Sequence, residues 1–366
     1  MTALFAYPER VEREGLELRF PRESDAPAVR VAVDDDQTRR FLASVPDQVT
    51  DGFAQAWCGA DAERIREQHG VRYVVFDGAE LVGGVTFKRV VAERTQAEIG
   101  YWVAAAARGK SVATKAVRAA VAAAFEAGLG RIELLAEPEN PVSQRVALAA
   151  GFHREGIRRM PAGRGRDRYD FVAYARLSTD PGDPIPRVIP DLPDGRLTDG
   201  VVTLRPVSPA DVDDLVRLMR RPEVAATSFG DASREAVQRK CSRVASSWIA
   251  GERADMAITD AQTGAFAGDI NFLYFMPFLQ EGMIGYSLLP EFRGRGFATR
   301  AVNLMAQWAF DHVRIARLVA GTDPDNTASQ RVLQRAGFTN EAYMRDRLPG
   351  PGGGRLDDIQ WLRLPG

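Results

Sequence analysis

The chain has 366 residues, and its 48 lysines and arginines nearly balance 49 aspartates and glutamates, for a net charge of −1. This length suits two domains of common size, and the scattered basic residues argue against a nucleic-acid partner. No apolar run reaches the roughly 18 residues of a membrane span, and no stretch is typical of a signal peptide. With two cysteines and three isolated histidines, we expect a cytoplasmic protein with no disulfide, no membrane partner and no metal.

In chain order, the first half alternates short strands with polar helical stretches. We expect a strand around Leu18, helices within 25–70, strands at 72–76 and 82–87 about a turn at Gly78, a strand containing Ile99-Gly100-Tyr101, a loop at 108–114 followed by a helix, a strand at 132–136, a helix ending before Gly151, and a last strand at 169–177.

The second half has the same order. We expect a strand around Leu204, helices within 211–250, strands at 256–258 and 268–272 about a turn at Gly264, a strand at 284–289, a loop at 293–299 followed by a helix, a strand at 318–321, a helix ending before Gly337, and a last strand at 357–364. A glycine-rich turn at 349–354 is either a lid over a substrate groove or a plain surface turn.

A repeat this long indicates a duplicated domain. We predict domains at 1–178 and 197–366, joined by a proline-rich linker at 179–196 that packs little. Each domain is expected to be α+β, with a mixed, mostly antiparallel sheet flanked by helices. A doubly wound parallel sheet does not fit this order of elements.

The most informative motif is a basic, glycine-bearing loop between a strand and a helix. Arg293 to Thr299 follow the strand that contains Ile284-Gly285-Tyr286, and Arg108 to Thr114 follow Ile99-Gly100-Tyr101. Glycines allow backbone N–H groups to close on a phosphate, and the helix dipole and arginines favour its charge. An Asn-x-x-Ser-x-x-Val segment and a Gly-Phe pair follow in both halves, and each half is therefore expected to be an anion-binding domain.

This ordered set of motifs resembles the GNAT superfamily of N-acyltransferases, as a tandem duplication of RimJ/RimL-type domains. The resemblance covers both halves and implies acetyl-CoA, or another acyl-CoA, as the donor. The residues that match the cofactor contacts of that family are Leu288, Leu289, Arg293, Gly294, Arg295, Gly296, Phe297, Ala298, Thr299 and Asn326 in the second half, and Arg108, Gly109, Lys110, Ser111, Val112, Ala113 and Asn140 in the first.

The resemblance also assigns catalytic roles. The N–H group of Leu288 would face the thioester carbonyl as an oxyanion donor, and Ser329 would protonate the departing thiolate, with Ser143 as its equivalent in the first half. The attacking amine must be neutral, which costs roughly 4.6 kcal/mol for a lysine-like amine at pH 7. Glu98 matches the glutamate suited to act as the base. The second half has Met283 there, and Glu281 is either its replacement or a solvated glutamate.

The two halves depart from the family pattern in different ways. The first half has Ser111 where the pattern has glycine, and its Cβ is expected to crowd the phosphate, whereas the second has a complete loop without the usual glutamate. The second half is therefore the expected catalyst, and the first is either a second active copy or a degenerate one that supports it.

We expect an enzyme that transfers an acyl group to a small amine, an antibiotic-like amine or a peptide N-terminus. Two alternatives are a non-catalytic acyl-CoA sensor or scaffold, and an acyltransferase that takes its acyl group from a carrier protein. The sequence leaves open the acceptor, the length and carrier of the acyl chain, the activity of the first half and whether the chain forms a homo-oligomer.

Overall fold

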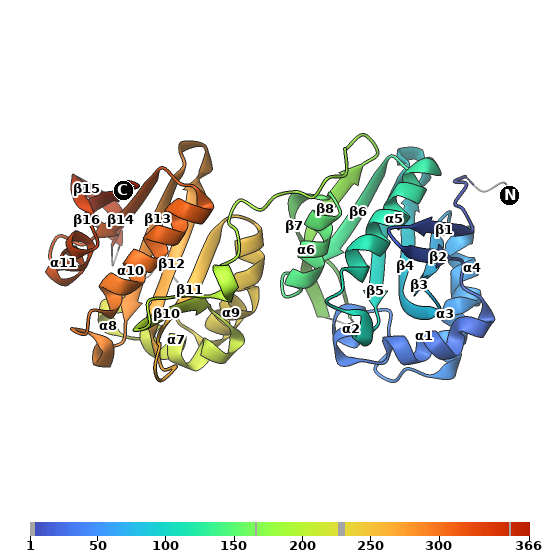
Figure 1. Cartoon of the computed structure of the whole chain (residues 1–366), viewed down its shortest axis with the longest axis horizontal. Helices are drawn as coiled ribbons and strands as arrows, with labels where there is room; N and C mark the ends of the chain where they lie inside the picture. Colours follow the sequence, from blue (N-terminus) through green and yellow to red (C-terminus); the bar gives the residue numbers. More distant parts are fainter. Residues whose placement is uncertain (1–3, 165–166, 226–230, 351–352) are drawn as a thin grey trace. The chain divides into compact units, whose positions relative to one another are not determined.

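The structure is a computed structural model that describes residues 4–164, 167–225, 231–350 and 353–366. It divides into two compact units, residues 1–186 and 187–366, each of which is described by itself (Figure 1). The division falls inside the segment 179–196 that the sequence marks as a linker. Residues 351–352 of the glycine-rich turn lie outside the described residues.

The first unit contains eight described strands and six described α-helices. They are β1 (Arg10–Arg13), β2 (Leu16–Arg19), α1 (Ala26–Val33), α2 (Asp36–Phe41), α3 (Asp51–Cys58), α4 (Ala60–Glu67), β3 (Val71–Asp77), β4 (Glu80–Val91), β5 (Gln96–Val103), α5 (Val112–Glu126), β6 (Arg131–Ala136), α6 (Pro141–Ala149), β7 (His153–Arg164) and β8 (Asp167–Leu177).

The second unit repeats this order. Its elements are β9 (Leu197–Thr198), β10 (Val202–Pro206), α7 (Val212–Met219), α8 (Pro222–Ala225), α9 (Arg234–Ile249), β11 (Arg253–Asp260), β12 (Phe266–Met276), β13 (Glu281–Leu288), α10 (Phe297–Trp308), β14 (Arg317–Thr322), α11 (Thr327–Arg335), β15 (Thr339–Pro349) and β16 (Arg355–Arg363).

Each unit is built on one mixed sheet of eight strands. The strand order is β1-β2-β3-β4-β5-β6-β8-β7 in the first unit and β15-β16-β14-β13-β12-β11-β10-β9 in the second. Only β5 with β6 and β13 with β14 pair in parallel among the described strands; all other pairs are antiparallel. The α+β fold expected from the sequence is therefore confirmed.

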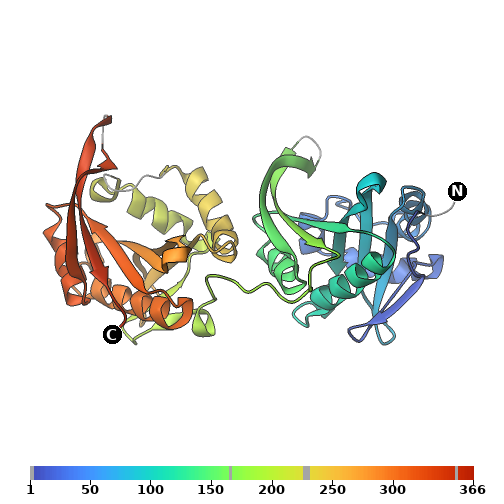
Figure 2. The ribbon, with the colours of Figure 1, turned by 90° about the horizontal axis from the view of Figure 1, so that it is seen from above.

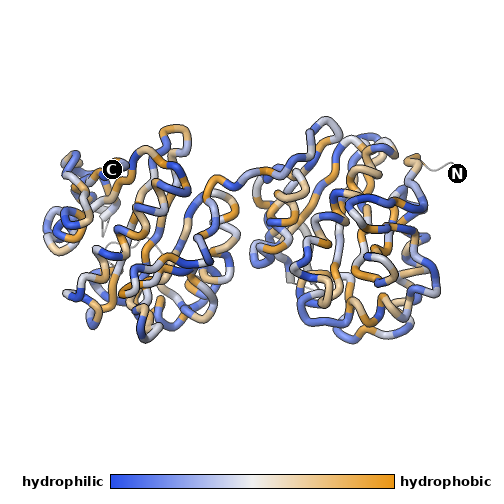
Figure 3. The backbone as a smooth tube through the Cα atoms, viewed as in Figure 1, coloured by the Kyte–Doolittle hydropathy of each residue, from blue (hydrophilic) through white to orange (hydrophobic). Residues whose placement is uncertain are grey.

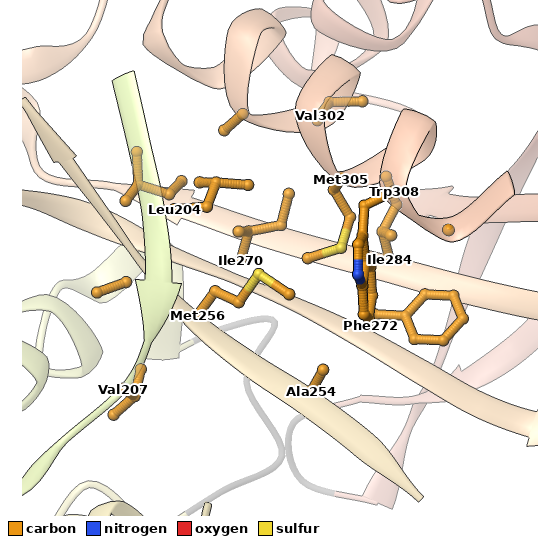
Figure 4. Close-up of a cluster of buried hydrophobic side chains, with 14 of the residues drawn as sticks. Leu204, Val207, Ala254, Met256, Ile270, Phe272, Ile284, Val302, Met305 and Trp308 are labelled. Carbon is orange, nitrogen blue, oxygen red and sulfur yellow. The ribbon is translucent and has the colours of Figure 1, made fainter. Parts of the chain in front are cut away.

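The core of the second unit lies between its sheet and α10. Ile270 and Phe272 of β12 and Ile284 of β13 point to the same face, where Met305 and Trp308 of α10 cover them (Figure 4). All five side chains are at most 3 % exposed. Helices α7 and α9 lie on the opposite face (Figure 2). On the other face, Asp269 and Asn271 of β12 and Gly285 and Ser287 of β13 are partly exposed.

The linker does not behave as the proline content suggests. Ile189 and Leu192 are buried in the core of the second unit, and Trp248 Nε1 donates a hydrogen bond of 2.9 Å to the Pro190 carbonyl. The expectation that 179–196 packs little is therefore wrong for its second part. Two apolar side chains three residues apart anchor this proline-rich segment, because proline lacks a backbone N–H donor but does not prevent its neighbours from being buried.

Figure 3 shows the hydrophobic stretches along the chain inside each unit.

The structure also bears on cysteine chemistry, metal binding and membrane insertion. Cys58 and Cys241 are both buried free thiols. Among the residues that the structure describes, no cluster of three or more His, Cys, Asp or Glu side chains is arranged to hold a metal ion. Within those same ranges, no helix has the length and apolar character needed to cross a membrane.

An arginine–aspartate pair fixes the start of each unit. Arg205 contacts Asp211 through two hydrogen bonds of 2.6 and 2.8 Å, and Arg19 contacts Asp25 in the same way at 2.7 and 2.8 Å. Burial opposes ionisation of Asp211, but the bonds from Arg205 and from the Ser208 amide outweigh it and lower its pKa below the ordinary value. The pair therefore stabilises the folded state only while Asp211 is ionised.

Removing the Asp211 carboxylate should lower the free energy of unfolding at neutral pH but not in strong acid. For Asp211→Asn we expect a loss of roughly 1–3 kcal/mol at pH 7, because Arg205 loses its charged partner. The folded-state pKa is depressed, so the difference from wild type should be full above about pH 4 and vanish as the pH falls through the folded pKa. Urea unfolding of both proteins between pH 2.5 and 7 measures this, and a pH-independent difference would contradict it.

Helices α5 and α10 both start after a residue with a left-handed backbone. Gly296 has a φ of 79° and Gly294 one of 72°, and Ser111 takes the same conformation at 60°. A Cβ built at Gly296 meets no protein atom within 4 Å, so the cost of Ser111 lies in its backbone conformation rather than in contacts with the protein. For a residue with a Cβ that cost is about 1–2 kcal/mol.

Ser111→Gly should therefore stabilise the first unit by about 1 kcal/mol, because the strained backbone is relieved. Ser111→Ala is the matched control, since it removes the hydroxyl and keeps the Cβ, and we expect it to give little gain. Thermal unfolding followed by circular dichroism compares the three proteins. Equal stability of the glycine and alanine variants would show that backbone strain is not the cause.

Candidate active site

The site begins where two parallel strands separate. β13 and β14 pair from Glu281 with Arg317 to Ile284 with Ala320, and no pairing continues from Gly285 onward. The first unit repeats this, with pairing that ends at Ile99 and Leu134. Beyond these points the strand of the Ile-Gly-Tyr motif keeps a neighbour on one side only, so its backbone amides on the other side are left for a ligand.

The orientation of these amides follows from one hydrogen bond. The Leu289 N–H donates to the Ala267 carbonyl at 2.9 Å, on the β12 side. Backbone amides alternate in direction along a strand, so the N–H groups of Leu288 and Tyr286 face the side that β14 has left. In the first unit the equivalent bond joins Ala104 to Val82, also at 2.9 Å. This orientation is the one that an oxyanion donor at Leu288 requires.

The loop after this strand presents a helix start without a side-chain cap. Neither Gly296 before α10 nor Ser111 before α5 caps its helix, although serine is a good cap in other conformations. The first-turn N–H groups of Phe297, Ala298 and Thr299, and those of Val112 and Ala113, therefore have no side-chain acceptor. Uncapped amides at a helix N-terminus form an anion site together with the helix dipole.

The first arginine of each loop is held by the protein itself. Arg293 donates two hydrogen bonds of 2.9 and 3.0 Å to the Leu288 carbonyl and lies 2.7 Å from Glu223. Arg108 donates to the Val103 carbonyl and contacts Asp35 at 2.7 Å. These arginines brace the end of the strand, a role that the sequence analysis did not anticipate.

Asp35 shows how firmly this contact is made in the first unit. Burial raises the pKa of Asp35, but hydrogen bonds from Arg108 and Thr38 outweigh it and lower the pKa to about 2.

In the second unit the loop residue just before the helix start is Arg295, whose guanidinium stacks on Phe292 and Phe297 with centroid distances of 5.3 and 4.7 Å. Its guanidinium is half exposed, and Lys110 of the first unit is also exposed.

The asparagine and serine of the second motif meet the first motif through a tyrosine. Asn326 caps α11 by accepting a hydrogen bond of 3.0 Å from the Ser329 amide. The Ser329 Oγ lies 2.7 Å from the Tyr286 hydroxyl, and in the first unit the Tyr101 hydroxyl donates to the Ser143 Oγ at 3.0 Å. The serine of each unit is therefore fixed beside the Ile-Gly-Tyr strand.

The tyrosine of this pair keeps its proton. Burial raises the pKa of Tyr286 to about 12, although the bond to Ser329 works in the opposite direction. Tyr101 is raised to about 12 for the same reason. The sequence analysis assigned no role to either tyrosine, yet their repetition in both Ile-Gly-Tyr motifs was the available signal.

The two candidate glutamates lie elsewhere on the strand. Glu281 contacts Arg317 at 2.8 Å, and Glu98 contacts Arg89 at 2.8 Å and Lys88 at 3.3 Å. Glu281 begins β13 and Leu288 ends it, which separates them by roughly 23 Å at ~3.3 Å per residue. A base at Glu281 and a thioester carbonyl at Leu288 are therefore too far apart for direct proton transfer.

Comparisons with known proteins identify the family of both halves. The family model of the acetyltransferase (GNAT) domain matches residues 15–153 and again 202–339. The chain is 40% identical over 70 residues to the probable N-acetyltransferase YjcK of Bacillus subtilis, covering 19% of this chain and 39% of that protein. It is 34% identical over 107 residues to the ribosomal-protein-serine acetyltransferase of Escherichia coli, covering 29% of this chain and 59% of that enzyme.

The chain thus spans about two fifths and three fifths of the lengths of these two relatives. Among solved structures, RimJ of Mycobacterium smegmatis in complex with CoA-disulfide aligns with a TM-score of 0.40 and 24% identity, over 46% of this chain and 84% of that one. The two domain matches together take in more than half of the chain. The chain therefore belongs to the GNAT acetyltransferase family, with two domains of that family in tandem.

Proposed function

We propose that the second unit transfers an acetyl group from acetyl-CoA to a primary amine by direct attack on the thioester. The observation that carries this proposal is the meeting of three features at one end of β13. These are the unpaired strand edge at Tyr286 and Leu288, the uncapped start of α10, and Ser329 fixed by Tyr286. Together they offer amides for an acyl carbonyl, amides for a diphosphate and a hydroxyl for a leaving thiolate.

The donor would lie along the edge of β13 that β14 leaves. The backbone of 294–299 would hold the diphosphate, and the half-exposed Arg295 would add charge to it. Asn326 would contact the pantetheine arm, and Leu289, whose N–H is bound to Ala267, would align the strand. No covalent intermediate on the protein is needed, because the amine attacks the thioester itself.

The serine–tyrosine pair suits protonation of the thiolate. When the Tyr286 O–H donates to the Ser329 Oγ, the serine O–H is free to point at the departing sulfur. Because Tyr286 keeps its proton at neutral pH, this arrangement persists across the working range. Leu333, at the position where many family members carry a tyrosine acid, is buried in the apolar core. Ser329 is therefore the proposed acid.

We propose a peptide N-terminus as the acceptor class. One relative is a ribosomal-protein-serine acetyltransferase by name, and its matched stretch covers 59% of its length. An α-amine has a pKa of about 7.7, so roughly one sixth of it is neutral at pH 7, against about one part in 2,500 of a lysine-like amine. A small amine is the alternative acceptor, and parallel assays with both classes decide between them.

The first unit has the same strand edge and the same serine–tyrosine pair, and it also carries Glu98. We propose that it binds the cofactor more weakly than the second unit. Its Ser111 places a side chain where Gly296 has none, and Asp35 offsets the charge of Arg108 more closely than Glu223 offsets that of Arg293, since Asp35 is less exposed. A non-catalytic sensor would combine CoA binding with no turnover in either unit.

A carboxylate placed in the phosphate loop should remove cofactor binding. For Gly296→Glu we expect the Kd for CoA of the second unit to rise at least 100-fold, because like charges meet at the helix start. Gly296→Ala is the matched control, because it adds a Cβ and backbone strain without a charge, and it should weaken binding far less than the glutamate variant. Isothermal titration calorimetry on the full chain measures both affinity and stoichiometry. Unchanged affinity in the glutamate variant would contradict the proposed cradle.

Removing the serine hydroxyl should slow release of the thiol. For Ser329→Ala we expect kcat to fall about 10- to 100-fold with little change in the Kd for CoA, since the thiolate loses its proton donor. Thiol release with a serine-initiated peptide measures this, and Ser242→Ala on the exposed surface of α9 is the control. A loss of activity in Ser143→Ala but not in Ser329→Ala would assign catalysis to the first unit instead.

A further inference from the structure

The face of the second sheet on which α7 and α9 lie carries a carboxylate beside the proposed reaction centre. Asp269 of β12 stands directly opposite Ser287 of β13, and Ser287 lies between Tyr286 and Leu288, whose amides face the edge that β14 leaves. Residues opposite each other on antiparallel strands have Cβ atoms about 4.5–5.5 Å apart. Asp269 is therefore one strand away from the place where the thioester carbonyl would sit.

Asp269 also lies on a part of this face that keeps some exposure to solvent. It alternates with Ile270 and Gly268, and Ile270 points into the core beneath α10. The opposite face, which Asp269 shares with Gly285 and Ser287, is partly exposed at all three residues. Gly268 brings the two strands close together here, because a Cβ at that position would collide with the Ser287 carbonyl oxygen.

The first unit fills the equivalent positions with an apolar pair. The register of β4 with β5 places Gly84 opposite Trp102, and a Cβ at Gly84 would lie 2.6 Å from the indole Nε1. Trp102 packs edge-on against Trp57 with ring centroids 5.8 Å apart. An aspartate and a serine thus stand in the second unit where the first has a glycine covered by tryptophan.

The two basic side chains near Asp269 form ion pairs with a different carboxylate, that of Asp255. The residues whose charges act on it are Lys240 of α9 and Arg253 and Asp255 of β11. Arg253 and Lys240 contact Asp255 at 2.6 and 3.3 Å, and Asp255 is only 4 % exposed. In the described part of the chain, no other side chain donates a hydrogen bond to the Asp269 carboxylate, which accepts one from its own backbone amide. A partly buried carboxylate without such a partner is suited to bind a cation.

We propose that Asp269 holds the ammonium group of the acceptor and takes its proton, so that the second unit needs no glutamate before its Ile-Gly-Tyr motif. This inference rests on the proposed transferase function. It assigns the base to β12 rather than to Glu281, which lies at the far end of β13 and is paired with Arg317 at 2.8 Å.

The proton balance of the step is complete. Asp269 as the carboxylate accepts one proton from the bound ammonium, and the neutral nitrogen attacks the thioester carbon. The C–S bond breaks, the second nitrogen proton leaves as the amide forms, and the thiolate receives a proton through Ser329. Overall, ammonium and thioester become amide and thiol, and one proton is released when Asp269 ionises again.

The basicity of Asp269 fits this role. Burial raises its pKa to about 6, with Asp255 acting in the same direction and Lys240 and Arg253 against it. A base works best when its pKa lies near the operating pH, where it is ionised and still takes up a proton readily. The carboxylate would be ionised above about pH 6 and lost as a base below it.

The test compares Asp269→Asn, Glu281→Gln and the wild-type full chain, with Asp311→Asn as a matched control. Asp311 is an exposed aspartate in the helical turn after α10, on the side of the sheet away from Asp269. Acceptors are a serine-initiated tripeptide and a linear diamine. The readouts are thiol release as a function of pH, the Kd for CoA by calorimetry, and the Tm.

We expect Asp269→Asn to lower kcat/KM about 100-fold or more and to raise KM for the amine, while Tm and the Kd for CoA stay at wild-type values. The wild-type kcat should bend near pH 6, whereas the variant's kcat should keep rising to the pKa of the amine, about 7.7 for the peptide. Asp311→Asn should behave as wild type in every assay.

Three results would overturn the inference. One is a kcat/KM for Asp269→Asn within threefold of wild type, with the bend near pH 6 retained. Another is loss of that bend in Glu281→Gln instead. The third is a wild-type protein that binds CoA but transfers acetyl to neither amine, in which case the transferase proposal fails together with this one. The first two results leave the transferase proposal intact, so the two failures are distinguishable.

Discussion

The separation of β13 from β14 after Ile284 is the constraint on which the site depends. The backbone amides of a strand inside a sheet form hydrogen bonds with neighbours on both sides. Those at the edge of a sheet form hydrogen bonds with water instead. Here an interior strand gives up one neighbour over its last residues while it keeps the other, through bonds such as Leu289 to Ala267. The amides of Tyr286 and Leu288 are held rigidly in place by β12, which is the condition for a preorganised oxyanion site.

Holding that strand end open needs its own support, and the loop arginine supplies it. Arg293 binds the Leu288 carbonyl and Glu223, while Tyr286 binds the first turn of α11 through Ser329. These two contacts tether the end of β13 to α8 and to α11. Because Arg108 and Tyr101 make the equivalent contacts in the first unit, this support is common to both units.

The scaffold was predictable from the sequence because its signals are local and occur twice. The glycine loop, the Asn-x-x-Ser segment and the alternation of strands each lie within a few residues, and their repetition in both halves identified them. Burial of Ile189 and Leu192 was not predictable, because a proline-rich composition reports backbone restrictions and says nothing of tertiary partners. The Tyr286–Ser329 contact joins residues 43 positions apart, so only the folded sheet brings it into view.

The carboxylates show the same limit more clearly. Strand alternation puts Glu281 and Met283 on one face of β13, but that face also includes residues of the neighbouring strands. Asp269 lies 18 positions before Ser287 in the chain, and only the register of β12 with β13 sets the two residues opposite each other. With Asp269 as the proposed base, both units would keep the same backbone site while the side-chain chemistry of the second unit lies on a neighbouring strand. In the first unit Trp102 covers Gly84 and Glu98 stays on the Ile-Gly-Tyr strand, whereas the second unit exchanges both features at once. A change of acceptor chemistry would require such a paired exchange, because in the proposed mechanism the face that carries Asp269 both binds the amine and takes its proton.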